Sequence, residues 1–252
     1  MDKEGKDFNF SLKNSKGQVT IFIIIAILII ASAVLIFTFR DKIGLGIFSS
    51  NSDPVYLFVQ NCVQETGQDA IHFITQQGGY LFPPTLSTSD GIPYYFYNKK
   101  DYMPTKDRIG EEISDYITNS ISYCTNGFTN FPDLNITEGE IKANAKIEDE
   151  KIILDVVYPL TIKQGESTKK FENFDNINIQ ARVGVIYNSI QSIIQEQVGK
   201  DSICLSCISE IVDKEGLTLD MTNIEEAIIF TITDKYSKIK DVPVGWRFAN
   251  GY

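Results

Sequence analysis

The sequence predicts an α+β fold that follows an N-terminal transmembrane helix, and three observations support this. An uncharged apolar run extends over residues 17–39. Several later stretches place apolar residues at helical spacing. Other stretches alternate apolar and polar residues, which is typical of antiparallel strands with one buried face. We therefore expect amphipathic helices packed on an antiparallel sheet, in one extracytoplasmic domain over residues 53–252.

The charge balance of the chain excludes one large class of partners. The sequence holds 33 acidic and 23 basic residues, a formal net charge of −10. Because the phosphates of nucleic acids need a basic surface, we expect no nucleic-acid partner. An acidic surface is instead typical of an exposed domain that must stay soluble.

The apolar run over residues 17–39 is long enough to cross a membrane. At about 1.5 Å per helical residue it spans the roughly 30 Å of a hydrocarbon core. Four lysines precede the run, whereas only Arg40 and Lys42 follow it closely. This bias predicts a cytoplasmic tail over residues 1–16, a juncture over residues 40–52, and an integral single-pass protein of the cell membrane.

Three fates of this segment remain open from its residues. It is a signal anchor that is retained whole, or a signal peptide that is cut after Ala33, or a segment that is processed at its cytoplasmic end. The motif Ala31-Ser32-Ala33 fits the second fate. However, residues 34–39 continue the apolar or neutral run, so that cut would fall inside the bilayer.

The third fate rests on a family resemblance. The sequence Lys16-Gly17-Gln18-Val19-Thr20 and the apolar run behind it resemble the class III signal peptide of archaeal type IV pilin-like proteins. The resemblance implies cleavage between Gly17 and Gln18, with the apolar segment kept as the N-terminal helix. Many pilins have a Glu at the fifth mature position, where this chain has Phe22. The resemblance implies a cell-envelope protein whose partners are envelope proteins or pilin-like subunits.

Two amphipathic helices open the predicted domain. The first begins with Asp53 as its N-cap and Pro54 in its first turn, and it ends at Gly78-Gly79. The second begins near Thr105 or Asp107 and continues to about Cys124. Residues 80–104 hold five tyrosines and four prolines with little periodicity, so we expect an ordered, aromatic-rich loop. We favour a loop that packs over the core, and the alternative is that Tyr94 to Tyr97 bind a glycan or a protein.

The clearest strand signal is a hairpin. Residues 141–147 and 152–162 alternate apolar and polar side chains on either side of a polar turn. Pro159 marks either an edge strand or a bulge. Polar residues 125–138 predict a loop. The remaining expected elements are a strand over 168–180, helices over 181–198 and 202–214, strands over 217–221 and 228–232, and a last strand near the end of the chain.

Cys62 and Cys124 lie on the apolar faces of two different predicted helices. If these helices pack together, the two sulfur atoms come within reach of each other. We favour a disulfide, which fits an extracytoplasmic domain because disulfides persist in oxidising compartments. The alternative is two ordinary buried thiols.

Cys204 and Cys207 form a C-x-x-C motif with three interpretations: a local structural disulfide, a thiol-disulfide redox pair, or half of a zinc site. A thioredoxin-like pair opens a helix after a strand, whereas here a helix precedes the motif. A structural zinc ion takes four ligands, and only Cys62, Cys124 and His72 remain to supply them. We therefore favour the local disulfide and expect no metal and no cofactor.

No catalytic constellation stands out. His72 is the only histidine and lies beside the apolar stripe of its helix, so Ser-His-Asp hydrolysis is not expected. A carboxylate pair stays open, because acidic residues are numerous and no pair can be singled out. Asn135 begins a glycosylation sequon on the outer side. The sequence thus predicts a non-enzymatic envelope protein with a structural, adhesive or interaction role, and an anchored redox enzyme or carboxylate hydrolase is the alternative.

Overall fold

The structure, a computed structural model, describes residues 24–31, 53–200, 203–224 and 226–251. The chain divides into two units, Met1–Ser49 and Ser50–Tyr252. In the first unit, residues 24–31 form a helix whose side chains are exposed. Among the described residues, no helix has both the length and the apolarity needed to cross a membrane.

Several predictions for the start of the chain lie outside the described residues. They are the tail over residues 1–16, the processing site at Gly17 and Gln18, and the juncture over residues 40–52. The same holds for both ends of the apolar run over residues 17–39. The transmembrane span therefore stays a prediction.

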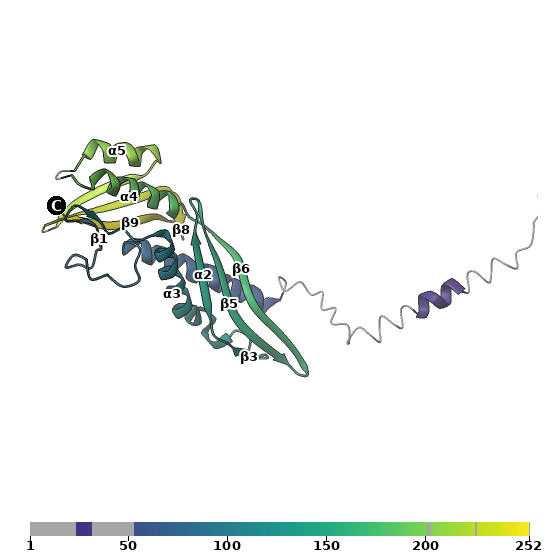
Figure 1. Ribbon diagram of the computed structural model, residues 1–252. Coiled ribbons are helices and arrows are strands. Elements are labelled where there is room, and N and C mark those ends of the chain that lie inside the picture. Colours follow the sequence, from purple (N-terminus) through teal and green to yellow (C-terminus); the bar gives the residue numbers. More distant parts are fainter. Residues whose placement is uncertain (1–23, 32–52, 201–202, 225, 252) are drawn as a thin grey trace, which may run out of the picture. The chain divides into compact units, whose positions relative to one another are not determined.

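The second unit has the predicted α+β composition, with helices and two sheets (Figure 1). Its helices are α2 (Pro54–Gln76), α3 (Lys106–Thr125), α4 (Val183–Gln197) and α5 (Leu205–Lys214), with a short 3-10 turn, η2 (Asn126–Phe128), after α3. Helices α2 and α3 match the predicted pair closely. Asp53 caps α2, and the hydroxyl of Thr105 accepts a hydrogen bond from the Arg108 N–H at the start of α3.

One sheet is antiparallel throughout and contains the predicted hairpin. Its strands are β3 (Asn135–Glu138), β4 (Lys142–Ile147), β5 (Lys151–Gln164) and β6 (Ser167–Gln180). Strand β5 is central, with β6 on one side and β3 and β4 in succession on the other. The register shifts around Pro159, so the bulge alternative for this residue is confirmed and the edge alternative is wrong. Strand β3 was not predicted, because residues 125–138 were expected to form a loop.

The other sheet corrects the expectation of a single antiparallel sheet. Its strand order is β2 (Lys100–Asp101), β1 (Tyr94–Tyr97), β9 (Val242–Gly251), β8 (Ala227–Ile239) and β7 (Thr218–Ile224). Strand β1 runs parallel to β9, and the other pairs are antiparallel. Tyr95 and Phe96 are fully buried in β1, so this aromatic segment, expected to be a loop, is a strand that packs into the core.

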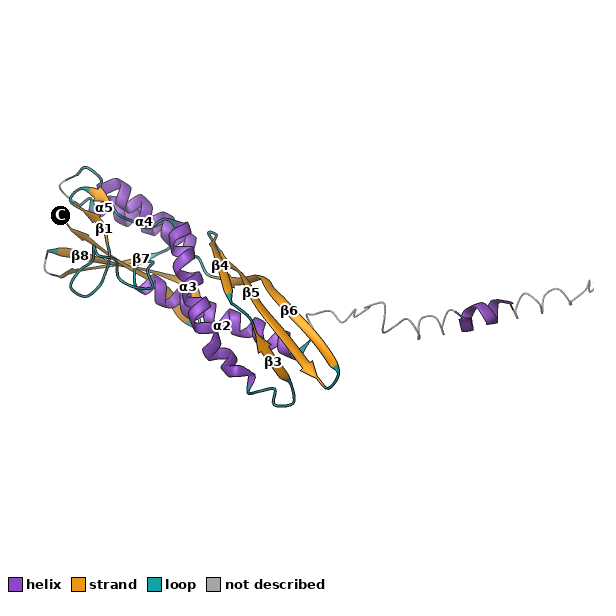
Figure 2. Ribbon diagram, turned by 60° about the horizontal axis from the view of Figure 1, so that its bottom comes forward, coloured by secondary structure: helices purple, strands orange, loops and turns teal. Residues whose placement is uncertain are grey.

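A single large apolar cluster joins both sheets to the helices. Helix α2 packs against β6 and β9, and α3 packs against α2 and β4 (Figure 2). At the centre of the cluster, Trp246 donates its Nε1–H to the Tyr95 hydroxyl at 3.0 Å, and Tyr95 donates to the Gly78 carbonyl at 2.8 Å. Helix α4 lies between the five-stranded sheet and α5 (Figure 1).

Asp53 ties the start of α2 to β6. Its carboxylate accepts hydrogen bonds from the Val55 N–H at 2.9 Å and from Lys169 Nζ at 2.8 Å. Partial burial would raise the pKa of Asp53, but the hydrogen bonds and the positive charge of Lys169 outweigh it and lower the pKa below its ordinary value. A lowered folded-state pKa means that this carboxylate stabilises the fold above its unfolded pKa, and that the stabilisation is lost as the pH falls through the folded pKa.

We therefore expect Asp53→Asn to destabilise the protein at pH 7 by about 0.5–1 kcal/mol, because the side-chain cap is kept while the ion pair is lost. The difference from the wild-type protein should shrink as the pH falls below about 4. Urea unfolding of both proteins at pH 7 and at pH 3 measures this. A difference that is equal at the two pH values would contradict the assigned role of the charge.

Candidate functional site at the start of helix α5

Helix α5 forms where a short amphipathic segment covers α4. Ile208 and Val212, four residues apart, are its buried side chains. The helix ends before Gly216, which has a positive φ of 69° and reverses the chain toward β7. These contacts fix the position of the residues at the N-terminal end of α5.

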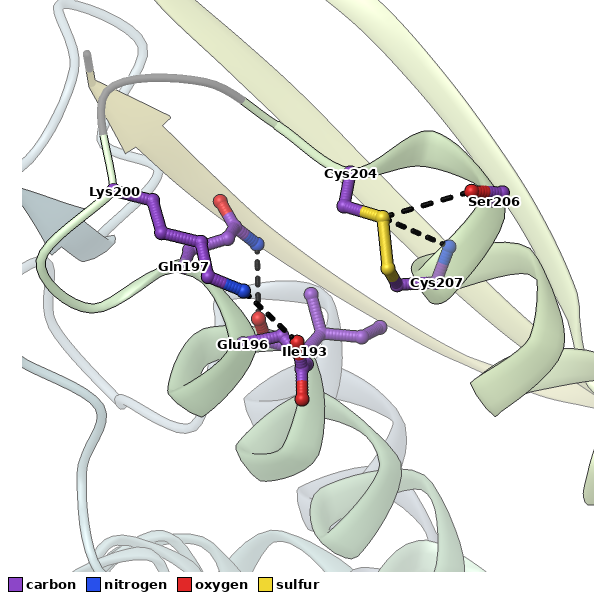
Figure 3. Close-up of a disulfide and its surroundings, with 7 residues drawn as sticks. All are labelled: Ile193, Glu196, Gln197, Lys200, Cys204, Ser206 and Cys207. Carbon is purple, nitrogen blue, oxygen red and sulfur yellow. Dashed lines mark hydrogen bonds and ion pairs between the residues drawn. A yellow bond between two sulfur atoms is a disulfide. The ribbon is translucent and has the colours of Figure 1, made fainter.

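The C-x-x-C motif opens this helix. Cys204 and Cys207 form a disulfide, and Cys204 is the N-cap of α5. The Cys204 Sγ accepts a hydrogen bond from the Cys207 N–H at 3.3 Å, and the Ser206 hydroxyl lies 3.6 Å from the same sulfur (Figure 3). The prediction of a local disulfide is confirmed. The predicted helix over 202–214 is observed as α5, and a helix, α4, precedes the motif as expected; the weak start expected near Asp201 and Ser202 is replaced by the Cys204 sulfur as the cap.

The two disulfides differ in their access to solvent. Cys204 and Cys207 are half-buried, and Leu205 between them is 54% exposed. The disulfide between Cys62 and Cys124, which was also predicted, joins α2 to α3; Cys62 is only 1% exposed and Cys124 is half-buried. Both sulfurs of the bridge on α5 are therefore open to a second thiol, whereas one of the two sulfurs in the bridge between α2 and α3 is buried.

Charged residues of both signs surround the disulfide on α5. At the end of α4, Lys200 Nζ lies 3.0 Å from Glu196 Oε2 (Figure 3). Cys207 lines a shallow hollow of about 300 Å³, whose other lining residues are Glu196, Glu210, Ile211 and Lys214. The surroundings thus combine carboxylates and ammonium groups with the apolar side chain of Ile211.

This arrangement can support thiol-disulfide exchange. The first N–H groups of a helix lack partners within the helix and carry partial positive charge, which favours an anionic sulfur at the N-cap. In the reduced form, a Cys204 thiolate would keep the Cys207 N–H as its donor. The sequence signal for this was the C-x-x-C spacing alone; Ser206 and Glu196 had no signal that linked them to the motif.

The other predicted site residues lie apart from this disulfide. Asn135 is exposed at the first position of β3, where a glycan could be attached. His72 is exposed on α2. Since all four cysteines are paired, the sulfur ligands of the zinc alternative are taken up by disulfides. Within the described ranges, no group of three or more His, Cys, Asp or Glu side chains could hold a metal ion.

Searches against protein-family models, curated proteins and solved structures find no match for the sequence or the fold.

Proposed function

We propose that the protein is a cell-envelope protein whose α+β domain lies outside the cytoplasm and serves a structural, adhesive or interaction role. Residues 17–39 anchor it in the membrane as a single transmembrane helix. The observation that carries the proposal is the disulfide between Cys62 and Cys124, which joins α2 to α3 and whose Cys62 is buried. A disulfide that links two core helices is a permanent part of the fold, and such bonds persist in oxidising compartments.

Two features of the sequence support the same role. The acidic domain follows an uncharged apolar run with lysines before it, and this charge bias favours a domain on the outer side. The pilin-like residues Lys16 to Thr20 imply a place among envelope proteins. The partners expected on this basis are other envelope proteins or pilin-like subunits.

Thiol labelling in intact cells tests the topology. Phe82, which is 77% exposed, is replaced by Cys to report on the domain, and Ser11→Cys reports on the tail. Because the native cysteines are paired, a membrane-impermeant maleimide should react with Phe82→Cys in intact cells and with Ser11→Cys only after lysis. Labelling of Ser11→Cys in intact cells, with Phe82→Cys labelled only after lysis, would contradict the proposal.

The intact mass of the protein from its own membranes identifies the fate of the anchor. A mature chain that begins at Gln18 supports pilin-type processing, and one that begins at Met1 supports a retained signal anchor. A chain that begins at Val34 would mean that the domain is released, which contradicts the anchored form.

One observation favours a second candidate function, thiol-disulfide exchange at Cys204 and Cys207. A thiolate of a substrate dithiol attacks the Cys204 sulfur, and Cys207 leaves as a thiolate. The second thiolate of the substrate then attacks the substrate sulfur that is bonded to Cys204, and Cys204 leaves as a thiolate. The substrate loses two electrons and becomes a disulfide, while Cys204 and Cys207 become a dithiol. A second disulfide-bearing protein must reoxidise that dithiol. The N-cap position of Cys204 supports this candidate.

Stepwise reduction separates the two disulfides. As dithiothreitol is raised, alkylation followed by peptide mass analysis should find Cys204 and Cys207 modified well before Cys62 and Cys124. In the exchange candidate, Cys207→Ser should also trap a mixed disulfide through Cys204, and Cys204→Ser should trap none. If Cys207→Ser forms no mixed disulfide in its own membranes, the bridge has a structural role only.

A further inference from the structure

Strand β7 (Thr218–Ile224) is an edge of the five-stranded sheet with an open side. All seven of its residues pair in regular register with β8. In the part of the chain that the structure describes, no strand pairs with its other side. About half of the N–H and C=O groups of an edge strand point away from its neighbour, so β7 can accept a further strand.

The other strand edges of the domain are protected. At the edge of β4, the Ala145 N–H donates to Ser114 Oγ of α3 at 2.9 Å. A Cβ atom on Gly110 would lie 2.4 Å from the Ala145 carbonyl oxygen, so the glycine lets α3 cover this edge directly. Strand β2 has only two residues and β3 only four, and β6 is irregular in its pairing and carries Lys169 and Lys170. Short edges, lysines and bulges are the usual means of blocking strand addition.

Strand β7 has none of these means. Its sequence, TLDMTNI, contains no lysine, arginine or proline, and Asp220 is its only charged residue. Its pairing with β8 shows no bulge. Met221 at its centre is 43% exposed. Among the described strands, β7 is thus the long edge best suited to pairing with another chain.

We propose that β7 pairs antiparallel with β7 of a second copy of this chain, about a two-fold axis at Met221. In this register all seven residues find a partner. Asp220 lies opposite Thr222 of the second copy, and Thr218 lies opposite Ile224 of the second copy. The two copies of Met221 lie side by side and cover each other, which removes exposed apolar surface from water.

Charge and strand length favour this register over the registers with the axis one residue earlier or later. Two-fold pairing of antiparallel strands places a residue opposite its own copy, and directly opposed residues share a face of the sheet. An axis at Asp220 would set two aspartates against each other, which is unfavourable. An axis at Thr222 would pair only five of the seven residues. The axis at Met221 keeps the full length and puts a hydroxyl, a hydrogen-bond donor, opposite each Asp220 carboxylate.

A cross-link detects the pairing in the full-length protein in detergent micelles. Met221→Cys should give a disulfide-linked dimer under mild oxidation. Val242→Cys is the matched control, because Val242 has a similar exposure of 47% and lies in the same sheet but away from the β7 edge. Equal cross-linking of the two variants would overturn the proposal.

Charge substitutions test the register. Thr222→Lys places a lysine opposite Asp220 of the second copy at both symmetry-related positions, and should tighten the dimer by about 2- to 30-fold. Thr222→Asp places an aspartate there, and should weaken the dimer by a similar factor. Thr218 is also exposed but faces Ile224 of the second copy, so Thr218→Lys and Thr218→Asp should differ little from each other. The measurement is the dimer dissociation constant by analytical ultracentrifugation.

The outcomes separate this proposal from the function proposed above. Dimerisation in micelles depends on neither the topology of the anchor nor the redox state of Cys204 and Cys207, so a failed labelling experiment leaves it standing. Monomeric protein at all accessible concentrations would overturn the dimer proposal. A shift of the dimer equilibrium in the same direction by Thr222→Lys and by Thr222→Asp would also overturn it. Binding of an extended segment of another protein at β7, without self-pairing, would also overturn it.

Discussion

Replacing both Cys62 and Cys124 by alanine should lower the free energy of unfolding by about 4 kcal/mol. The two residues are 62 positions apart, so their disulfide closes a long loop and strongly restricts the unfolded chain. The bond also joins α2 to α3 inside the apolar cluster, where Cys62 packs with the buried valines of α2. Loss of both sulfurs removes the cross-link and leaves a small cavity.

The matched control is the replacement of Cys204 and Cys207 by alanine. These residues are only three positions apart, so the same model assigns their disulfide about 2 kcal/mol at most. Trp246 is the only tryptophan and is fully buried, so its fluorescence reports unfolding in urea for the full-length protein in detergent. Equal losses in the two double variants would contradict the assignment of Cys62–Cys124 as the structural bridge.

The elements that the sequence predicted well have local signals. Asp53 and Pro54 begin α2 for two local reasons. The Asp53 side chain accepts a hydrogen bond from an N–H of the first turn, and Pro54 has no N–H that would need a partner there. The hairpin of β4 and β5 follows from strict alternation, since each apolar side chain on one face contacts the same core. The pairing of Cys62 with Cys124 follows from the same logic, because both lie on core-facing stripes.

The elements that it missed depend on contacts between distant residues. Tyr94 to Tyr97 become a strand only because β9, about 150 residues later, offers a free parallel edge beside Trp246. No periodicity within residues 80–104 carries that information. The N-cap role of Cys204 was missed for a different reason: the usual capping residues are Ser, Thr, Asp and Asn, and a disulfide sulfur is not among them.

A further residue without a sequence signal is Arg182, whose replacement by alanine should cost about 3–5 kcal/mol. Its Nη1 lies 2.8 Å from Asp234 Oδ2, and the side chain of Asp234 is fully buried. Its Nη2 donates to the Glu215 carbonyl at 3.2 Å, and its backbone N–H donates to Ser237 Oγ at 2.9 Å. Arg182 therefore holds together the start of α4, the irregular part of β8 and the link from α5 to β7.

The cost arises mainly from the group that is left behind. Without Arg182, the Asp234 carboxylate keeps only the Tyr236 N–H, at 2.9 Å, and stays buried without a positive partner. An unpaired buried charge is far more costly than the net gain of forming the pair. Glu150 gives the control, because it lies 3.6 Å from Arg182 Nε but is 70% exposed. Glu150→Ala should change the stability by less than about 0.5 kcal/mol.

A double variant separates the pair itself from the penalty of breaking it. Removing both charges, as Arg182→Met with Asp234→Leu, leaves no unpaired ion, so its loss of stability should be smaller than that of Arg182→Ala alone. Urea unfolding, followed by Trp246 fluorescence, measures the wild-type protein, Arg182→Met, Asp234→Leu and the double variant on one scale, with Arg182→Ala beside them. If the losses of Arg182→Met and Asp234→Leu simply add in the double variant, the two side chains do not act as a pair. The link between α4 and β8 must then depend on the hydrogen bond that the Arg182 N–H donates to Ser237 Oγ.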